Sequence, residues 1–179
     1  SFDKKHSKTY LLDAHWSLYC ENYLEGFHVP FIHKGLNNDI DFKTYNTILF
    51  DNGVLQYTKE TSSKINTKEK SLLENTYAYY YWIFPNIMLN FYNWGLSINI
   101  IEPISRNKTR VRFLSYPIKG CTQPIKNSSS LDKVEIEDQE IIRKVQRGIN
   151  SQSYLRGRYS AIHEKGIHHF HQLICKYIN

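Results

Sequence analysis

The chain has 179 residues, enough for one domain that buries most of the surface its unfolded form exposes. The formal net charge is +6, but lysines and arginines are scattered among acidic residues, so we expect no nucleic-acid partner. No apolar run approaches the ~20 residues that cross a bilayer, so we expect no membrane partner. The three cysteines are far apart and predict neither a disulfide framework nor a cysteine-rich metal site, which suits the cytoplasm.

A helix is predicted within residues 15–26, followed by a break. Its apolar residues have helical spacing: Trp16, Tyr19, Tyr23 and Leu24. Gly26 and Pro30 then end or distort the helix, because proline removes a helical hydrogen bond. His28 therefore lies where the regular helix stops.

From residue 41 onward the pattern changes to runs rich in Tyr, Ile, Phe and Thr, which are typical of β-strands. These runs cover residues 42–50, 54–60, 76–84, 87–103 and 109–119. The turn signals "DNG", "FPN" and "SRNK" between them predict an antiparallel meander. Residues 61–71 are predicted to form an exposed loop, and the polar residues 122–133 to separate the last strand from the helical part.

Two helices are predicted at the end of the chain, within residues 132–152 and 157–179. The apolar stripe of the first contains Val134, Ile141, Ile142, Val145 and Ile149. The stripe of the second contains Ile162, Phe170, Leu173, Ile174 and Tyr177. These elements predict an α+β domain whose antiparallel sheet wraps around a helix and leaves a cavity, with no internal repeat and no second core.

His28 and His33 are candidate metal ligands because Pro30 lies between them. On an uninterrupted helix their side chains would point about 140° apart and could not reach one ion. A bend at the proline lets the two imidazoles converge. Alone, the HxxxxH spacing is a weak signal, since two histidines at a helix end can equally be a capped or exposed pair.

Asp138 strengthens this hypothesis, because it continues the apolar stripe of its helix whereas Glu137 and Glu140 fall off it. A carboxylate on a buried face is costly unless it is paired or binds a metal; a helix dipole or an arginine partner are the alternatives. Two imidazoles and one carboxylate are the ligand set of non-haem Fe(II) oxygenases. Glu25 can accept the second N–H of the His28 ring and fix its tautomer, or be a solvated glutamate at a helix end.

At these residues the chain resembles the catalytic domain of the Rieske-type ring-hydroxylating oxygenase alpha subunit. The resemblance rests on the motifs "NYLEGFHVPFIH", "FPNIMLNFYNWGLSINIIEP" and "EDQEIIRKVQRGINSQSYLRGRYSAIHEKGIHHFHQLI", which follow one another in the family's order. It implies that His28, His33 and Asp138 bind mononuclear Fe(II), and that Glu25 takes the position of the acid that bridges two metal centres. A glutamate at the position of Glu25 resembles the branch of the family that includes choline and carnitine monooxygenases. This resemblance points to a quaternary-ammonium substrate.

The resemblance also implies a helix-grip (START-like) fold, with the sheet curved around a long C-terminal helix. Family members carry a Rieske domain whose 2Fe–2S cluster needs two cysteines and two histidines, and residues 1–179 contain no such pattern. We therefore interpret residues 1–179 as a single catalytic domain and expect the cluster on a missing N-terminal domain or a separate partner. Electrons would come from a reductase or ferredoxin, in a full-length homotrimer.

The resulting hypothesis is a mono- or dioxygenase that hydroxylates an aromatic or quaternary-ammonium compound with dioxygen. The isolated chain is expected to be inactive without a Rieske domain. The alternative is a helix-grip module that binds a ligand without chemistry, although such a module has no reason to place Asp138 on an apolar stripe. A zinc hydrolase fits less well, since it would usually have the HExxH spacing.

Overall fold

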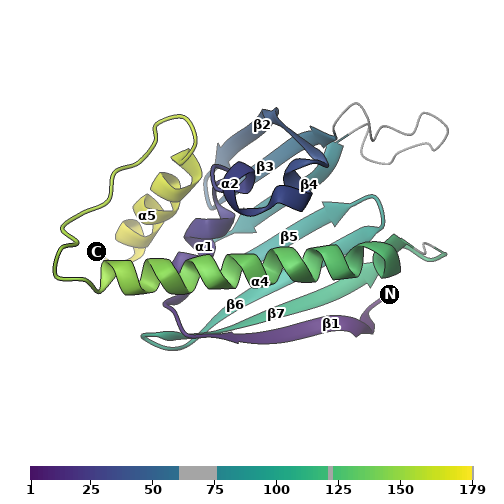
Figure 1. Ribbon diagram of the computed structural model, residues 1–179, viewed down its shortest axis with the longest axis horizontal. Helices are drawn as coiled ribbons and strands as arrows, with labels where there is room; N and C mark the ends of the chain where they lie inside the picture. The colour runs from purple at the N-terminus through teal and green to yellow at the C-terminus, as the bar shows by residue number, and fades with distance from the viewer. Residues whose placement is uncertain (61–75, 121–122, 179) are drawn as a thin grey trace.

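The computed structural model describes residues 1–60, 76–120 and 123–178 (Figure 1). In this part of the chain seven strands form one antiparallel sheet in the order β1-β7-β6-β5-β4-β3-β2. The strands are β1 (Asp3–Leu12), β2 (Ile40–Phe50), β3 (Gly53–Glu60), β4 (Thr76–Ile83), β5 (Ile87–Tyr92), β6 (Gly95–Ser105) and β7 (Lys108–Pro117). The predicted meander is confirmed, because β2 to β7 are neighbours in chain order. The loop predicted at residues 61–71 lies outside the described residues.

The strands differ from the prediction in two places. The run at residues 87–103 is divided into β5 and β6 by a turn at residues 93–94. Gly95 follows as the first residue of β6; its φ is 150°, and a Cβ there would lie 2.4 Å from the backbone oxygen of Tyr116. The strand β1 pairs with β7 but is not predicted, because its sequence "DKKHSKTYLL" is mostly polar. An edge strand with few buried side chains carries little hydrophobic signal, and in β1 only Leu12 is fully buried.

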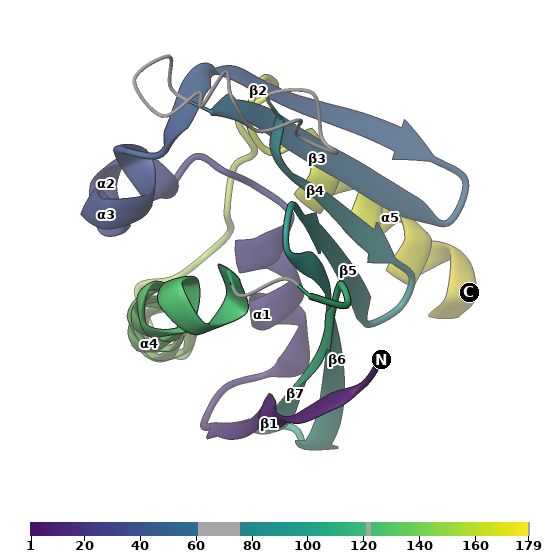
Figure 2. The same ribbon diagram turned by 90° about the vertical axis from the view of Figure 1, so that its right-hand side faces the viewer.

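The helices are α1 (Trp16–Tyr23), α2 (Val29–Ile32), α3 (Lys34–Asn37), α4 (Gln123–Ile149) and α5 (Lys165–Ile178). The sheet is curved, with α1 inside the curve and α4 along its open side (Figure 2). Helix α5 packs against α1 and against the end of β2, where Nε2 of His169 donates a hydrogen bond to the carbonyl oxygen of Phe50. None of the helices in the described residues is long and apolar enough to cross a membrane.

The two predicted C-terminal helices are confirmed, but their bounds differ. Helix α4 begins at Gln123, so the prediction that residues 122–133 form a separator is wrong. Helix α5 begins at Lys165, so Ile162 lies before it and is 75% exposed. The chain therefore ends in a helix of 14 residues, and the longer helix of 27 residues precedes it.

The buried face of α4 is more polar than its apolar stripe predicts. Ile142 is buried as expected, but Val145 is 42% exposed. The buried positions around Ile142 are instead Glu135, Gln139 and Gln146. These side chains tolerate burial because each forms hydrogen bonds: Glu135 with Tyr19 of α1 and with Gln139, and Gln146 with His15, the residue before α1.

The hydrophobic core lies at one end of the curve, between α1, α5 and the sheet. Phe170 of α5 is fully buried between Trp16 and Trp82, with ring centroids 5.7 Å and 5.2 Å away in edge-to-face geometry. Burying a side chain of this size contributes ~2–3 kcal/mol. This cluster packs the helices against one end of the sheet. Between α1, α4 and the rest of the sheet lies a cavity.

Candidate metal centre and its cavity

The segment between α1 and α2 brings two histidines to the same place. Gly26 packs against the ring of Tyr45, where a Cβ would lie 2.5 Å from the nearest ring carbon. Pro30 lies in the first turn of α2, a position at which its missing N–H costs no helical hydrogen bond. Proline thus starts a new one-turn helix beyond the end of α1, and His28 and His33 flank that turn.

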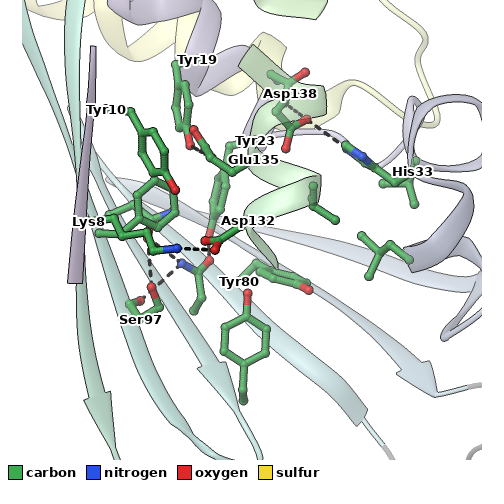
Figure 3. Close-up of a pocket in the computed structure, with 18 of the residues that line it drawn as sticks. Lys8, Tyr10, Tyr19, Tyr23, His33, Tyr80, Ser97, Asp132, Glu135 and Asp138 are labelled. Atoms are coloured by element: carbon green, nitrogen blue, oxygen red, sulfur yellow. Dashed lines mark hydrogen bonds and ion pairs between the residues drawn. The ribbon is translucent and has the colours of Figure 1, made fainter. Parts of the chain in front are cut away.

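His28, His33 and Asp138 meet although Asp138 lies more than 100 residues further along the chain. Each offers one ligand atom, and these atoms lie within 4.8 Å of one another. Nε2 of His33 is 3.0 Å from Oδ1 of Asp138, and Nε2 of His28 is 3.4 Å from the same atom. Figure 3 shows Asp138 on α4 facing His33. The three residues that the sequence selects as ligands therefore form one cluster.

Each histidine ring is held from its other nitrogen by a second carboxylate. Nδ1 of His28 lies 2.5 Å from Oε1 of Glu25, whose Oε2 also accepts a hydrogen bond from the backbone N–H of His28. Nδ1 of His33 lies 2.8 Å from Oε2 of Glu137. Both Nε2 atoms consequently point to Asp138, which is the orientation that a shared ion requires.

The three groups also shift one another's pKa. Burial alone would raise the pKa of Asp138, but hydrogen bonds from His28 and His33 outweigh it and lower the pKa to about 2. Burial would lower the pKa of His28, but hydrogen bonds to Asp138 and Glu25 raise it to about 9. The pKa of His33 is raised in the same way, against the effect of burial. Without an ion, a protonated His28 imidazole therefore balances the negative charge of Asp138 at neutral pH.

Two contacts of the cluster are missed by the sequence argument. Glu137 falls off the apolar stripe, but it points sideways to His33 instead of outward to solvent. Asn22 of α1, whose role the family motif leaves open, donates from Nδ2 to Oδ1 of Asp138 over 2.7 Å. In the sequence, the signal for this contact is that Asn22 opens the motif "NYLEGFHVPFIH", which also contains both histidines.

A cavity of about 370 Å³ extends from this cluster along the concave face of the sheet. Aromatic side chains form much of its lining, among them Tyr80, Tyr92 and Trp94. Its floor is polar where Nδ2 of Asn90 donates to Oδ1 of Asn99 over 3.2 Å. A cavity of this size with an aromatic wall and a few polar groups is typical of a small-molecule site.

The cavity of this curved antiparallel sheet is lined at one place by two imidazoles and one carboxylate, a set of side chains that is typical of non-haem Fe(II) oxygenases. The comparison with known families agrees. The chain belongs to the ring hydroxylating alpha subunit (catalytic domain) family, and the match to this family covers residues 1–179.

Curated relatives come from plants and bacteria. The chain is 36% identical to the chloroplastic choline monooxygenase of Arabidopsis thaliana over 172 residues, which are 93% of this chain and 40% of that protein. It is 28% identical to the carnitine monooxygenase oxygenase subunit of Escherichia coli (strain K12) over 180 residues, covering 91% of this chain and 46% of that protein. The chain thus spans less than half the length of these relatives.

Solved structures share the fold. The quaternary ammonium Rieske monooxygenase CntA in complex with an inhibitor matches with a TM-score of 0.80 at 22% identity, covering 100% of this chain and 50% of that one. Dicamba monooxygenase bound to dicamba matches with a TM-score of 0.65 at 16% identity, covering 97% of this chain and 59% of that one. The predicted resemblance to the choline and carnitine monooxygenases is confirmed.

Proposed function

We propose that this domain binds one mononuclear Fe(II) ion through His28, His33 and Asp138. The observation that carries the proposal is the meeting of three ligand atoms within 4.8 Å of one another at the end of an aromatic cavity. Proteins of this family use mononuclear iron together with a Rieske 2Fe–2S cluster. A mixed set of imidazole and carboxylate ligands suits Fe(II) and leaves coordination positions open.

The donor groups fit such an ion in charge as well as in kind. Two imidazoles with raised pKa values lie beside Asp138, and a divalent cation would supply the same positive charge once the imidazoles are neutral ligands. The hydrogen bonds from Nδ1 to Glu25 and Glu137 are compatible with that state and keep both Nε2 atoms directed at the ion. When bound, the iron supplies the dioxygen chemistry that protein side chains lack.

The cavity is proposed to bind an organic substrate that becomes hydroxylated, as in a mono- or dioxygenase. The protein's contribution is to hold the reacting carbon close to the ligand cluster and to exclude water from it. The choline and carnitine monooxygenase relatives favour a quaternary-ammonium compound. An aromatic compound is the second candidate, because the fold is shared with dicamba monooxygenase.

Electrons are proposed to reach the site through Glu25. Its carboxylate contacts both the ring and the backbone N–H of His28, and its side chain is 11% exposed. The Rieske cluster would lie on an N-terminal domain outside this chain or on a separate partner, fed by a reductase or ferredoxin. One structure of a quaternary ammonium Rieske monooxygenase is described as revealing inter-subunit electron transfer. We propose a homotrimer for the full-length protein and an inactive isolated chain.

Residues 1–179 are proposed to form a single catalytic domain. The finer fold assignment, a helix-grip (START-like) domain, is also a proposal, and α4 is the long helix that it involves. A non-catalytic helix-grip module is disfavoured because family membership and the Asp138 cluster both point to chemistry. The cytoplasm remains a prediction from the cysteine content alone.

The test is anaerobic titration of the purified chain with Fe(II), followed by metal analysis. We expect one iron per chain, lost in His28→Ala and in Asp138→Ala while circular dichroism shows an intact fold. Glu140→Ala is the matched control, because Glu140 lies on the same helix but is exposed and pairs with Lys144. Equal iron binding by all four proteins would refute the ligand assignment.

A further inference from the structure

Helix α4 presents three acidic side chains to the cavity at three-residue spacing: Asp132, Glu135 and Asp138. Two of them have cationic partners. Asp132 pairs with Nζ of Lys8 from β1, as Figure 3 shows, and Asp138 faces the two histidines. The acid between them is Glu135, for which no cationic partner is found in the described residues.

Glu135 is 7% exposed, and its hydrogen-bond donors are neutral. The hydroxyl of Tyr19 donates to Oε2 over 2.6 Å, and Nε2 of Gln139 donates to Oε1 over 2.8 Å. Among the residues that the structure describes, no lysine, arginine or histidine forms an ion pair with this carboxylate. A buried carboxylate without a counter-charge is costly unless something else supplies the positive charge.

The groups around Glu135 disfavour its ionised form. Burial raises its pKa to about 8, and the negative charges of Asp138 and Asp132 act in the same direction, against the hydrogen bonds from Tyr19 and Gln139. Across the cavity, Lys8 is already engaged by Asp132. A cation that enters the cavity would favour the ionised form of Glu135 and gain an unshared partner.

Two tyrosines, Tyr19 and Tyr10, lie near the carboxylate and line the same cavity. Burial, and then the charges of Asp132 and Glu135, raise the pKa of Tyr10 to about 12, so Tyr10 lies within the field of these acids. The ring of Tyr10 packs edge-to-face on Phe113 with centroids 5.7 Å apart. Figure 3 shows Tyr10 and Tyr19 next to each other, on the same side of Glu135. Ring faces together with a carboxylate attract an organic cation, including one that has no N–H to donate.

We propose that Glu135 is the counter-charge for the cationic group of a quaternary-ammonium ligand in this cavity. The inference rests on the proposed function, because it concerns substrate recognition at the same site. Glu135 would thus determine ligand specificity, because its negative charge favours a cation over an uncharged molecule of the same shape. Asp138, one turn further along α4, stays with the metal ligands.

The test compares two probes of equal shape and different charge. Choline and its uncharged carbon isostere, 3,3-dimethylbutan-1-ol, are titrated into the chain by calorimetry. The ratio of their affinities isolates the contribution of charge, since both fill the same space. The ratio is measured for the unaltered chain, for Glu135→Gln and for Glu140→Gln, which makes the same substitution at an exposed position of α4.

We expect the unaltered chain to bind choline about tenfold or more tighter than the isostere. Glu135→Gln should lose most of that preference through weaker choline binding alone, while Glu140→Gln keeps it. Equal binding of both probes by the unaltered chain overturns the proposal even where the Glu135→Gln variant fails to fold.

The remaining outcomes separate this proposal from the proposed function. A preference for choline that persists in folded Glu135→Gln overturns the role of Glu135 and leaves a quaternary-ammonium substrate in place. Binding of neither probe overturns both the role of Glu135 and that substrate class. Iron binding at His28, His33 and Asp138 is measured independently and is unaffected by either result.

Discussion

The metal-free ligand cluster should make the stability of the fold depend on pH. The pKa of His28 is raised from 6.5 to about 9, so its stabilising effect is complete below pH 6.5 and is lost as pH rises through about 9. The pKa of Asp138 is lowered from 3.8 to about 2, so its effect is present above pH 3.8 and is lost as pH falls through about 2. The metal-free cluster therefore stabilises the fold most between pH 3.8 and 6.5.

The magnitude follows from these pKa values. A difference of one in pKa corresponds to about 1.4 kcal/mol, so Asp138 indicates about 2–3 kcal/mol and His28 about 3–4 kcal/mol. The contribution is counted once, because the pKa values of His28 and Asp138 largely record the same interaction. Asp138→Asn removes the negative charge but keeps the size of the side chain. We expect it to lower the free energy of unfolding by about 2–3 kcal/mol near pH 6, and by much less near pH 9.5.

Urea unfolding in the presence of a chelator, followed by circular dichroism, measures this difference. Both proteins are compared at the two pH values, and the midpoint and slope are fitted separately so that a change in the unfolded state is recognised. A stability difference that is the same at both pH values would refute the charge argument. A rise in the stability of the unaltered chain between pH 6.5 and about 9 would contradict the direction of the His28 shift.

Two further substitutions have matched controls. Glu137→Ala removes the acceptor of His33 Nδ1 and should weaken Co(II) binding by about 10–100-fold, whereas exposed Glu140→Ala should leave it unchanged; equal affinities in a metal titration would contradict the orienting role. Gly166→Ala should destabilise the fold by about 1–3 kcal/mol, because its Cβ would lie 2.5 Å from a backbone oxygen at the end of α1. Gly148→Ala, with nothing within 4 Å, should be neutral or stabilising in the same denaturation assay.

The meander and the approach of the two histidines could be predicted because their signals are local. Strand runs and turn residues lie next to each other in the chain, so the order of β2 to β7 follows from sequence. The bend between His28 and His33 is likewise marked by Pro30. Asp138 is more distant in the chain. It could be predicted as a candidate ligand because a carboxylate on an apolar helix face is costly without a partner.

The polar partners of α4 could not be predicted in this way. The stripe argument assumes that the buried face of a helix is apolar, whereas α4 covers a cavity and buries Glu135, Gln139 and Gln146. Glu135 lies seven residues before Ile142 and so shares its face, which is a signal that the assumption hides. The edge strand β1 was not predicted for a related reason: several of its polar side chains line the cavity instead of a hydrophobic core.

Hydrogen bonds between α4 and the α1 segment explain how the proposed metal ligands keep their register. The backbone N–H of His15 donates to Oε1 of Gln146 over 2.7 Å, and Asn22 donates to Asp138 over the same distance. With the bond from Tyr19 to Glu135, these contacts tie three positions along α4 to α1 and to the residue that caps it. Apolar packing would allow small sliding movements, but hydrogen bonds with fixed partners do not. The polar face of α4 therefore holds Asp138 opposite the two histidines that follow α1.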